Sequence, residues 1–155
     1  MNIKLEKKEA FIVAGVKKEG IHPSQCHSVW QELFEEYSPV DYASLGRGES
    51  VGVCYGTMEP ETINYMAGYI VTNNEKAKDM GLDLLEVKAE EYSVLSLKGP
   101  IPTCIQEGWK YAFKVFFPEE GYEHSGAPDF EYYYEGDMES ADYEMELWIP
   151  VKKTV

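Results

Sequence analysis

The chain of 155 residues is long enough for one domain with a buried core. It carries 28 acidic against 14 basic residues, and its net charge of −14 repels nucleic-acid phosphates and anionic lipid. A content of 44% hydrophobic residues excludes a disordered chain. No apolar run approaches the ~18 residues of a membrane helix, and the first residues lack the apolar segment of a signal peptide. The sequence therefore predicts a cytoplasmic protein without a membrane segment.

The first half of the chain reads as strand, helix, strand, strand. Residues 9–16 are rich in β-forming side chains, and residues 24–37 place apolar side chains at helical spacing. Pro39 is expected to end that helix. A strand pair at 51–55 and 63–71 follows. The polar stretch 73–81 is interpreted as a partly helical connection to the second half.

The second half has the same order of elements. A strand is predicted at 92–97 and a helix at 103–117, which Pro118 is expected to end. A loop leads to two more strands, at 130–135 and 143–151. Two such units indicate an α+β fold, in which an antiparallel-dominated sheet carries two helices on one face.

The two halves also match in sequence. A shift of 79 positions, without gaps, places Trp30 on Trp109 and Phe34 on Phe113. We infer a single domain over residues 1–155, with halves at about 1–73 and 82–155 related by a pseudo-twofold axis. A ligand groove is expected at the seam between the halves, because small molecules often bind at such places. A chance match at the best of many offsets is the alternative.

Alternation along the strands sorts side chains onto two faces. The face predicted to lie under the helices collects mainly large apolar residues: Val51, Val53, Tyr55, Met66, Gly68, Ile70, Phe130, Tyr132, Tyr134, Met145, Leu147 and Ile149. The other face collects small, aromatic and acidic residues: Gly52, Cys54, Ala67, Tyr69, Glu131, Tyr133, Glu144, Glu146 and Trp148. The second set is unusual for a face that only meets solvent.

Carboxylates replace small residues on that second face. In the repeat, Glu131 takes the place of Gly52, and Glu146 takes the place of Ala67. An acid beside aromatic rings suits a flat apolar cation, because the rings add cation–π attraction. No Lys or Arg is close to Glu146 in sequence, which favours a partner from outside. The alternative is that the acids form the solvated side of an ordinary antiparallel sheet.

Several motifs resemble the GyrI-like small-molecule-binding superfamily, which is also the effector-binding domain of AraC-type and multidrug-responsive regulators. The resemblance is carried by Glu146-Leu147-Trp148-Ile149-Pro150-Val151, Pro128-Asp129-Phe130-Glu131-Tyr132, Lys98-Gly99-Pro100-Ile101 and the Phe117-Pro118 to Gly121-Tyr122-Glu123 segment. It implies a duplicated strand-helix-strand-strand fold and a groove that holds hydrophobic, often cationic compounds. The implied ligand-binding residues are Glu146, Trp148, Glu131 and Tyr133, to which the repeat adds Tyr69.

Three functions follow from these patterns and the resemblance. The first is a stand-alone binding module for hydrophobic cations, without direct nucleic-acid binding, because no helix-turn-helix precedes the first strand. The second is a hydrolase of strained electrophilic molecules in which Glu131 and Glu146 act as acid and base. The third is an acidic inhibitor of a basic protein partner such as DNA gyrase.

The sequence predicts neither a cofactor nor a metal. Its three histidines, His22, His27 and His124, are scattered, and its three cysteines have no paired spacing. Motifs for a phosphate loop or a nucleophile elbow are missing as well.

Overall fold

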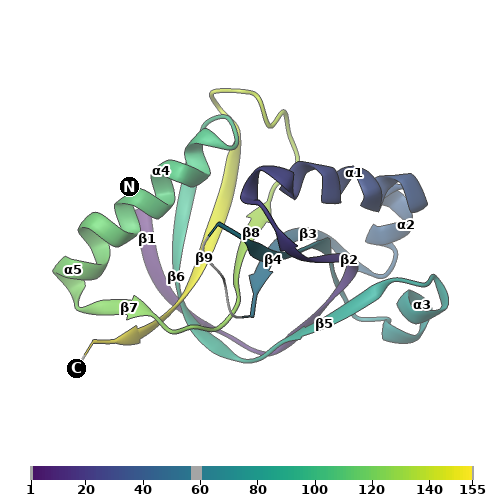
Figure 1. Cartoon of the computed structure of the whole chain (residues 1–155), viewed down its shortest axis with the longest axis horizontal. Helices are drawn as coiled ribbons and strands as arrows, with labels where there is room; N and C mark the ends of the chain where they lie inside the picture. The colour runs from purple at the N-terminus through teal and green to yellow at the C-terminus, as the bar shows by residue number, and fades with distance from the viewer. Residues whose placement is uncertain (1, 57–60, 155) are drawn as a thin grey trace. The chain divides into compact units, whose positions relative to one another are not determined.

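The computed structural model describes residues 2–56 and 61–154 and shows a chain of two compact units (Figure 1). Unit 1 comprises Met1–Lys8 and Glu90–Val155, and unit 2 comprises Glu9–Ala89. This division differs from the predicted halves because the first strand pairs with a strand of the C-terminal part. Among the described residues, no helix has the length and apolar character needed to cross a membrane.

Unit 2 is a four-stranded antiparallel sheet with helices on one face. Its elements are β2 (Phe11–Ile21), η1 (Pro23–Gln25), α1 (Cys26–Glu36), α2 (Pro39–Ala43), β3 (Gly46–Tyr55), β4 (Ile63–Val71), α3 (Asn74–Asp79) and β5 (Asp83–Val87). The strand order is β3-β4-β2-β5. Helix α1 packs on β2 and β4 (Figure 1). The predicted strands, helix and partly helical connection are confirmed, whereas β5 was not predicted.

Unit 1 repeats this arrangement with its own helix. Its elements are β1 (Asn2–Lys8), β6 (Glu90–Lys98), α4 (Thr103–Tyr111), η2 (Ala112–Phe116), α5 (Phe117–Glu120), β7 (Tyr122–His124), β8 (Asp129–Tyr133) and β9 (Glu144–Lys153). The strand order is β1-β6-β9-β8, all pairs are antiparallel, and β7 pairs with the end of β9. The α+β class with a mostly antiparallel sheet is thus confirmed, and each unit contains the order strand, helix, strand, strand. The duplication and the groove between the halves stay predictions.

The second long helix extends beyond its predicted end. After α4 the chain makes a wide π turn, η2, and continues into α5. Pro118 lies in the first turn of α5, where a missing N–H is tolerated. The helix ends instead at Gly121, whose φ of 73° is the left-handed conformation that glycine adopts without strain.

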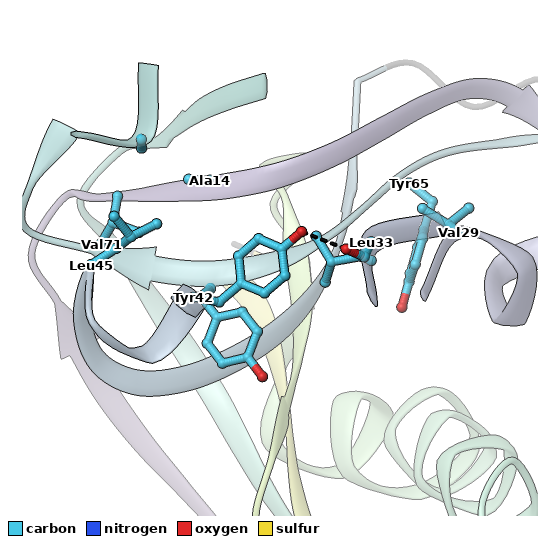
Figure 2. Close-up of a cluster of buried hydrophobic side chains, with 10 residues drawn as sticks. Ala14, Val29, Leu33, Tyr42, Leu45, Tyr65 and Val71 are labelled. Carbon is cyan, nitrogen blue, oxygen red and sulfur yellow. Dashed lines mark hydrogen bonds between the residues drawn. The ribbon is translucent and has the colours of Figure 1, made fainter. Parts of the chain in front are cut away.

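In unit 2 the predicted faces are inverted. The helix-covered core contains Tyr65, Ala67 and Tyr69 of β4 together with Val29 and Leu33 of α1, part of which Figure 2 shows. Tyr69 is 7% exposed, and its ring stacks on that of Tyr42 with a centroid distance of 5.4 Å. The hydroxyl of Tyr42 in turn donates a hydrogen bond to the carbonyl of Leu33 (Figure 2). Tyr69 therefore lies under the helix, and its assignment to the other face was wrong.

In unit 1 the predicted assignment of side chains to the two faces is correct for β9 but wrong for β8. Met145, Leu147 and Ile149 lie in the core together with Cys104 of α4, as expected. We call this side of the sheet the helix-covered face. Residues paired across two strands share a face, and Glu131 pairs with Leu147 while Phe130 pairs with Trp148. Glu131 and Tyr133 are consequently on the helix-covered face, and Phe130 and Tyr132 are on the opposite face.

A one-residue difference between the two hairpins explains the error. Gly52 pairs with Ala67 in unit 2. Glu131, which follows Gly52 by 79 positions, pairs with Leu147, which follows Ala67 by 80. A single gapless shift cannot fit both strands. Because side chains alternate with a period of two, a slip of one residue moves a whole strand's side chains to the other face.

Candidate ligand-binding site

The structure does not place the five predicted site residues on one face. Glu131 and Tyr133 lie on the helix-covered face of unit 1, and Glu146 and Trp148 lie on the opposite face of the same sheet. Tyr69 lies in the core of unit 2. Unit 1 therefore has two separate acidic centres, one on each face of its sheet.

The first centre is built around Glu131. Its side chain is half-buried, and its neighbour across the ladder is the fully buried Leu147. Tyr133 is two residues further along β8 and points to the same face. Its hydroxyl donates a hydrogen bond to Oε1 of Glu131 with an O···O distance of 2.5 Å. This pairing fixes the orientation of the carboxylate.

Apolar core residues lie next to Glu131. The ring of Tyr133 packs against the core cluster of unit 1, which includes Met145 and Leu147. Burial is the main cause that raises the pKa of the Cys104 thiol in α4, and the negative charges of Glu107 and Glu131 raise it further. The charge of Glu131 therefore acts on groups on the helix-covered face of the sheet. In such surroundings a carboxylate attracts a cation more strongly than it would in water.

The second centre is built around Glu146, and other parts of unit 1 already stabilise its charge. One carboxylate oxygen accepts a hydrogen bond from the Tyr134 hydroxyl at 2.6 Å, and the other accepts one from Nε1 of Trp148 at 3.0 Å. Lys4 of β1 is on the same face. Its pKa is raised mainly by the hydrogen bond and charge of Glu6, with a smaller contribution from Glu146.

The indole of Trp148 is part of a packed aromatic cluster. It is 9% exposed, stacks on Phe130 with a centroid distance of 5.3 Å, and makes a T-shaped contact with Tyr92 at a centroid distance of 5.5 Å. Nζ of Lys8, the last residue of β1, lies 5.6 Å from the centre of the indole ring. This distance is within the range of a cation–π interaction. Two lysines of β1 thus face the centre for which the sequence suggested a cation from outside.

Tyr92 contributes an unsatisfied group to the opposite face. Its side chain is fully buried, and its hydroxyl has no hydrogen-bond partner among residues 2–56 and 61–154. Burial is the main cause that raises the pKa of Tyr92 to about 12, with smaller contributions from Glu90 and Asp129. A buried hydroxyl without a partner destabilises the folded state.

Two shallow hollows of about 290 Å³ each lie elsewhere in unit 1. One is bordered by α5 and β7, and the other lies within the connection between β8 and β9. Neither is lined by Glu131 or Glu146. We place the candidate site at Glu131 on the basis of its chemistry.

Residues 1–152 match the family model of the GyrI-like small molecule binding domain. The chain belongs to this family. Among curated proteins, no sequence matches the chain. The family assignment confirms the resemblance inferred from the C-terminal motifs, and it gives the function at a coarse level: the chain is a small-molecule-binding domain.

Solved structures of similar fold include chains that this chain covers almost completely and a longer chain that it covers in part. SAV2435 bound to tetraphenylphosphonium has a TM-score of 0.81 at 21% identity, over 98% of this chain and 94% of that chain. EcmrR in its complex with DNA has a TM-score of 0.70 at 17% identity, over 98% of this chain and 57% of that chain. A hydrolase from Listeria innocua has a TM-score of 0.60 at 13% identity, over 97% and 91% of the two chains. At these identities the likeness shows the fold.

The lysines of β1 and the hydroxyl of Tyr134 were missed by sequence reasoning. Lys4, Glu6 and Lys8 alternate along β1, and this was a usable signal for a strand with a charged face. Tyr134 follows β8 directly, and its reach to Glu146 depends on the register of the hairpin. The sequence carries no signal for that register.

Proposed function

We propose that this chain binds apolar monovalent cations and that Glu131 supplies the negative charge. The observation that carries the proposal is a half-buried carboxylate, oriented by the Tyr133 hydroxyl at 2.5 Å, beside the apolar core of unit 1. A cation that reaches Glu131 gains more Coulomb energy there than at the protein surface. The acidic chain, with its net charge of −14, also attracts cations at long range.

Glu131 suits this role better than Glu146 does. Both oxygens of Glu146 accept hydrogen bonds, and Lys4 adds a positive charge on the same face. Nζ of Lys8 already lies over the indole of Trp148. A ligand cation on that face would compete with two lysines of the protein itself. We assign Glu146 and Trp148 to the internal structure of unit 1.

The proposed ligand is a cation that spreads its charge over an apolar body. An ammonium group needs several acceptors to replace its water, and its desolvation is costly where the surroundings are apolar. A phosphonium or quaternary ammonium has no N–H donors to satisfy. The tetraphenylphosphonium complex of SAV2435, a protein of the same fold, supports this choice.

A hydrolase that uses both glutamates is not favoured. Acid and base must both reach the reacting group of one substrate. The register between β8 and β9 places Glu131 and Glu146 on opposite faces of the sheet. We therefore carry only the binding function forward.

The proposal is tested by titrating tetraphenylphosphonium into wild type, Glu131→Gln and Glu120→Gln in a calorimeter. Glu120 is exposed at the end of α5, so its substitution removes the same charge away from the site. We expect wild type to bind in the micromolar range, about −8 kcal/mol. Glu131→Gln is expected to weaken binding at least ~10-fold, or about 1.4 kcal/mol, and Glu120→Gln to change it less than ~2-fold. Equal affinities of all three proteins would contradict the proposal.

A neutral ligand separates charge from shape. Triphenylphosphine oxide has similar phenyl groups but no net charge, so its affinity is expected to be the same in wild type and Glu131→Gln. If the substitution weakened both ligands equally, it would have changed the shape of the site, and the charge role of Glu131 would be refuted.

A further inference from the structure

Three rings at the far end of α4 form a nearly parallel stack. Trp109 stacks on Phe113 with a centroid distance of 5.6 Å and an interplanar angle of 13°. Trp109 also stacks on His124 of β7 at 6.4 Å and 14°. Phe113 is at the end of the stack and is 50% exposed, compared with 40% for Phe34 and 40% for Tyr134. The stack therefore ends in an aromatic ring that solvent can reach.

A hollow of about 290 Å³ adjoins this ring. Its apolar lining comes from Phe113, Phe117, Pro118 and Tyr122. Phe117 meets Phe113 edge to face, with a centroid distance of 5.3 Å and an angle of 87°. Aromatic rings thus line much of the hollow, and both stacked and edge-to-face contacts favour an additional aromatic ring.

Phe113 lies within a π turn. Residues 112–116 form η2, in which the helix is wider than an α-helix. Such turns are rare, and they occur frequently at functional sites. Here the turn begins one residue before Phe113 and ends directly before Phe117, so it contains one ring that lines the hollow and leads directly into another.

The polar groups around the hollow are already engaged. The hydroxyl of Thr154 donates to the carbonyl of Gly121 at 3.2 Å, and Glu123 pairs with Lys152 at 3.6 Å. His124 uses both ring nitrogens: Nδ1 accepts from the N–H of Gly126 at 2.9 Å, and Nε2 lies 3.1 Å from the Asp129 carboxylate. A ligand in this hollow would find ring surface and few free hydrogen-bonding groups.

We propose that this hollow is a second ligand site, which takes a planar aromatic cation by stacking on Phe113. The ring contacts select a flat aromatic body, and the net charge of −14 favours a positive one. None of the residues that line the hollow belongs to the Glu131 centre. The second site is thus independent of the function proposed for Glu131.

Unit 2 contains a matched control. Phe34 stacks on Trp30 with a centroid distance of 6.1 Å and an angle of 29°, and it is 40% exposed. The spacing of Trp30 and Phe34 in α1 is the same as that of Trp109 and Phe113. The hollow of unit 1 is not lined by Phe34. Removing Phe34 therefore deletes an equally apolar and similarly exposed ring without touching the proposed site.

The test is the number of ethidium ions, a planar aromatic cation, that the full chain binds in equilibrium dialysis. We expect two per chain for wild type and Phe34→Ala, and one for Phe113→Ala. Phe113→Leu keeps the apolar bulk but removes the ring, and it is also expected to bind one. Circular dichroism checks that every variant is folded. The second site would be overturned if both Phe113 variants still bound two ethidium ions per chain. It would also be overturned if wild type bound only one ethidium ion and Phe113→Ala bound one as well.

Glu131→Gln separates this inference from the proposed function. The Glu131→Gln variant is expected to lose the ethidium ion bound at Glu131 and to keep the one whose binding depends on Phe113. If wild type binds one ethidium and Glu131→Gln removes it, the second site is refuted while the Glu131 function stands. If only the Phe113-dependent ethidium is found in wild type, the Glu131 function fails and the second site stands.

Discussion

The two faces of the unit 1 sheet use the same residue types for different purposes. On the helix-covered face, the Tyr133 hydroxyl donates to Glu131 at 2.5 Å, and on the opposite face the Tyr134 hydroxyl donates to Glu146 at 2.6 Å. Glu146 also receives the indole N–H of Trp148 at 3.0 Å. Glu131 adjoins the apolar core. The neighbours of each glutamate therefore give the two carboxylates different surroundings, apolar core for Glu131 and polar or charged groups for Glu146.

The lysines of β1 add to the difference between the two faces. Lys4 and Lys8 reach the face of Glu146 because β1 pairs with β6, which pairs with β9. These residues are far from Glu146 in sequence. A carboxylate with a lysine on its own face is stabilised in the ligand-free protein, and it has less to gain from a ligand cation.

The largest expected effect comes from removing the apolar support of Glu131. Leu147 is fully buried and lies opposite Glu131 in the ladder. Leu147→Ala is expected to lower the free energy of unfolding by about 2 to 5 kcal/mol, because it leaves a cavity in the core. Urea unfolding followed by circular dichroism measures this loss. A loss below about 1 kcal/mol would show that the helix-covered face is not the tightly packed one.

A smaller effect on stability is expected from Glu146→Gln. The substitution replaces a charged acceptor of two hydrogen bonds with a neutral amide, which can accept at only one of the two positions. We expect the free energy of unfolding to fall by about 1 to 3 kcal/mol. The affinity for tetraphenylphosphonium should change less than ~2-fold, about 0.4 kcal/mol. A variant as stable as wild type that has lost cation binding would reverse the roles of the two glutamates.

Two buried tyrosines are expected to respond with opposite signs. The Tyr42 hydroxyl donates to the Leu33 carbonyl, so Tyr42→Phe should destabilise the protein by about 1 kcal/mol. The Tyr92 hydroxyl has no partner among the described residues, so Tyr92→Phe should stabilise it by about 1 kcal/mol. Both changes are read from urea unfolding midpoints. Destabilisation by Tyr92→Phe would indicate a polar partner on the opposite face, such as a buried water.

A pH-dependent effect is expected in alkaline solution. Burial raises the pKa of Tyr92 to about 12, whereas a tyrosine in the unfolded chain ionises near ~10. The unfolded state therefore loses its proton first. The stability linked to this group is complete below pH ~10 and is lost as the pH rises toward 12. Unfolding midpoints at pH 9 and 11 should differ less in Tyr92→Phe than in wild type, and equal differences would contradict this linkage.

The elements were predictable because their signals are local. Helical spacing of apolar residues gave α1 and α4, and β-forming runs gave the two hairpins of the predicted order. The family was recognisable from the run around Trp148 and the run around Glu131, and it is confirmed over residues 1–152.

The site was less predictable because it depends on registers. Glu131 and Tyr133 were assigned to the wrong face because the paired positions of β8 and β9 are one residue further apart in sequence than those of β3 and β4. The prediction for Tyr69 was wrong for the same reason: Tyr69 lies under α1, but one face assignment was applied to both halves. Alternation within a strand can be read from sequence, but the register between two strands depends on the loop and the packing.

The most direct test of the account is the structure of this chain crystallised with tetraphenylphosphonium. The account predicts that the phosphonium lies on the helix-covered face of unit 1, with Glu131 as the nearest carboxylate to phosphorus and with Lys8 still over Trp148. A phosphonium beside Glu146, with Lys8 displaced from the indole, would contradict it.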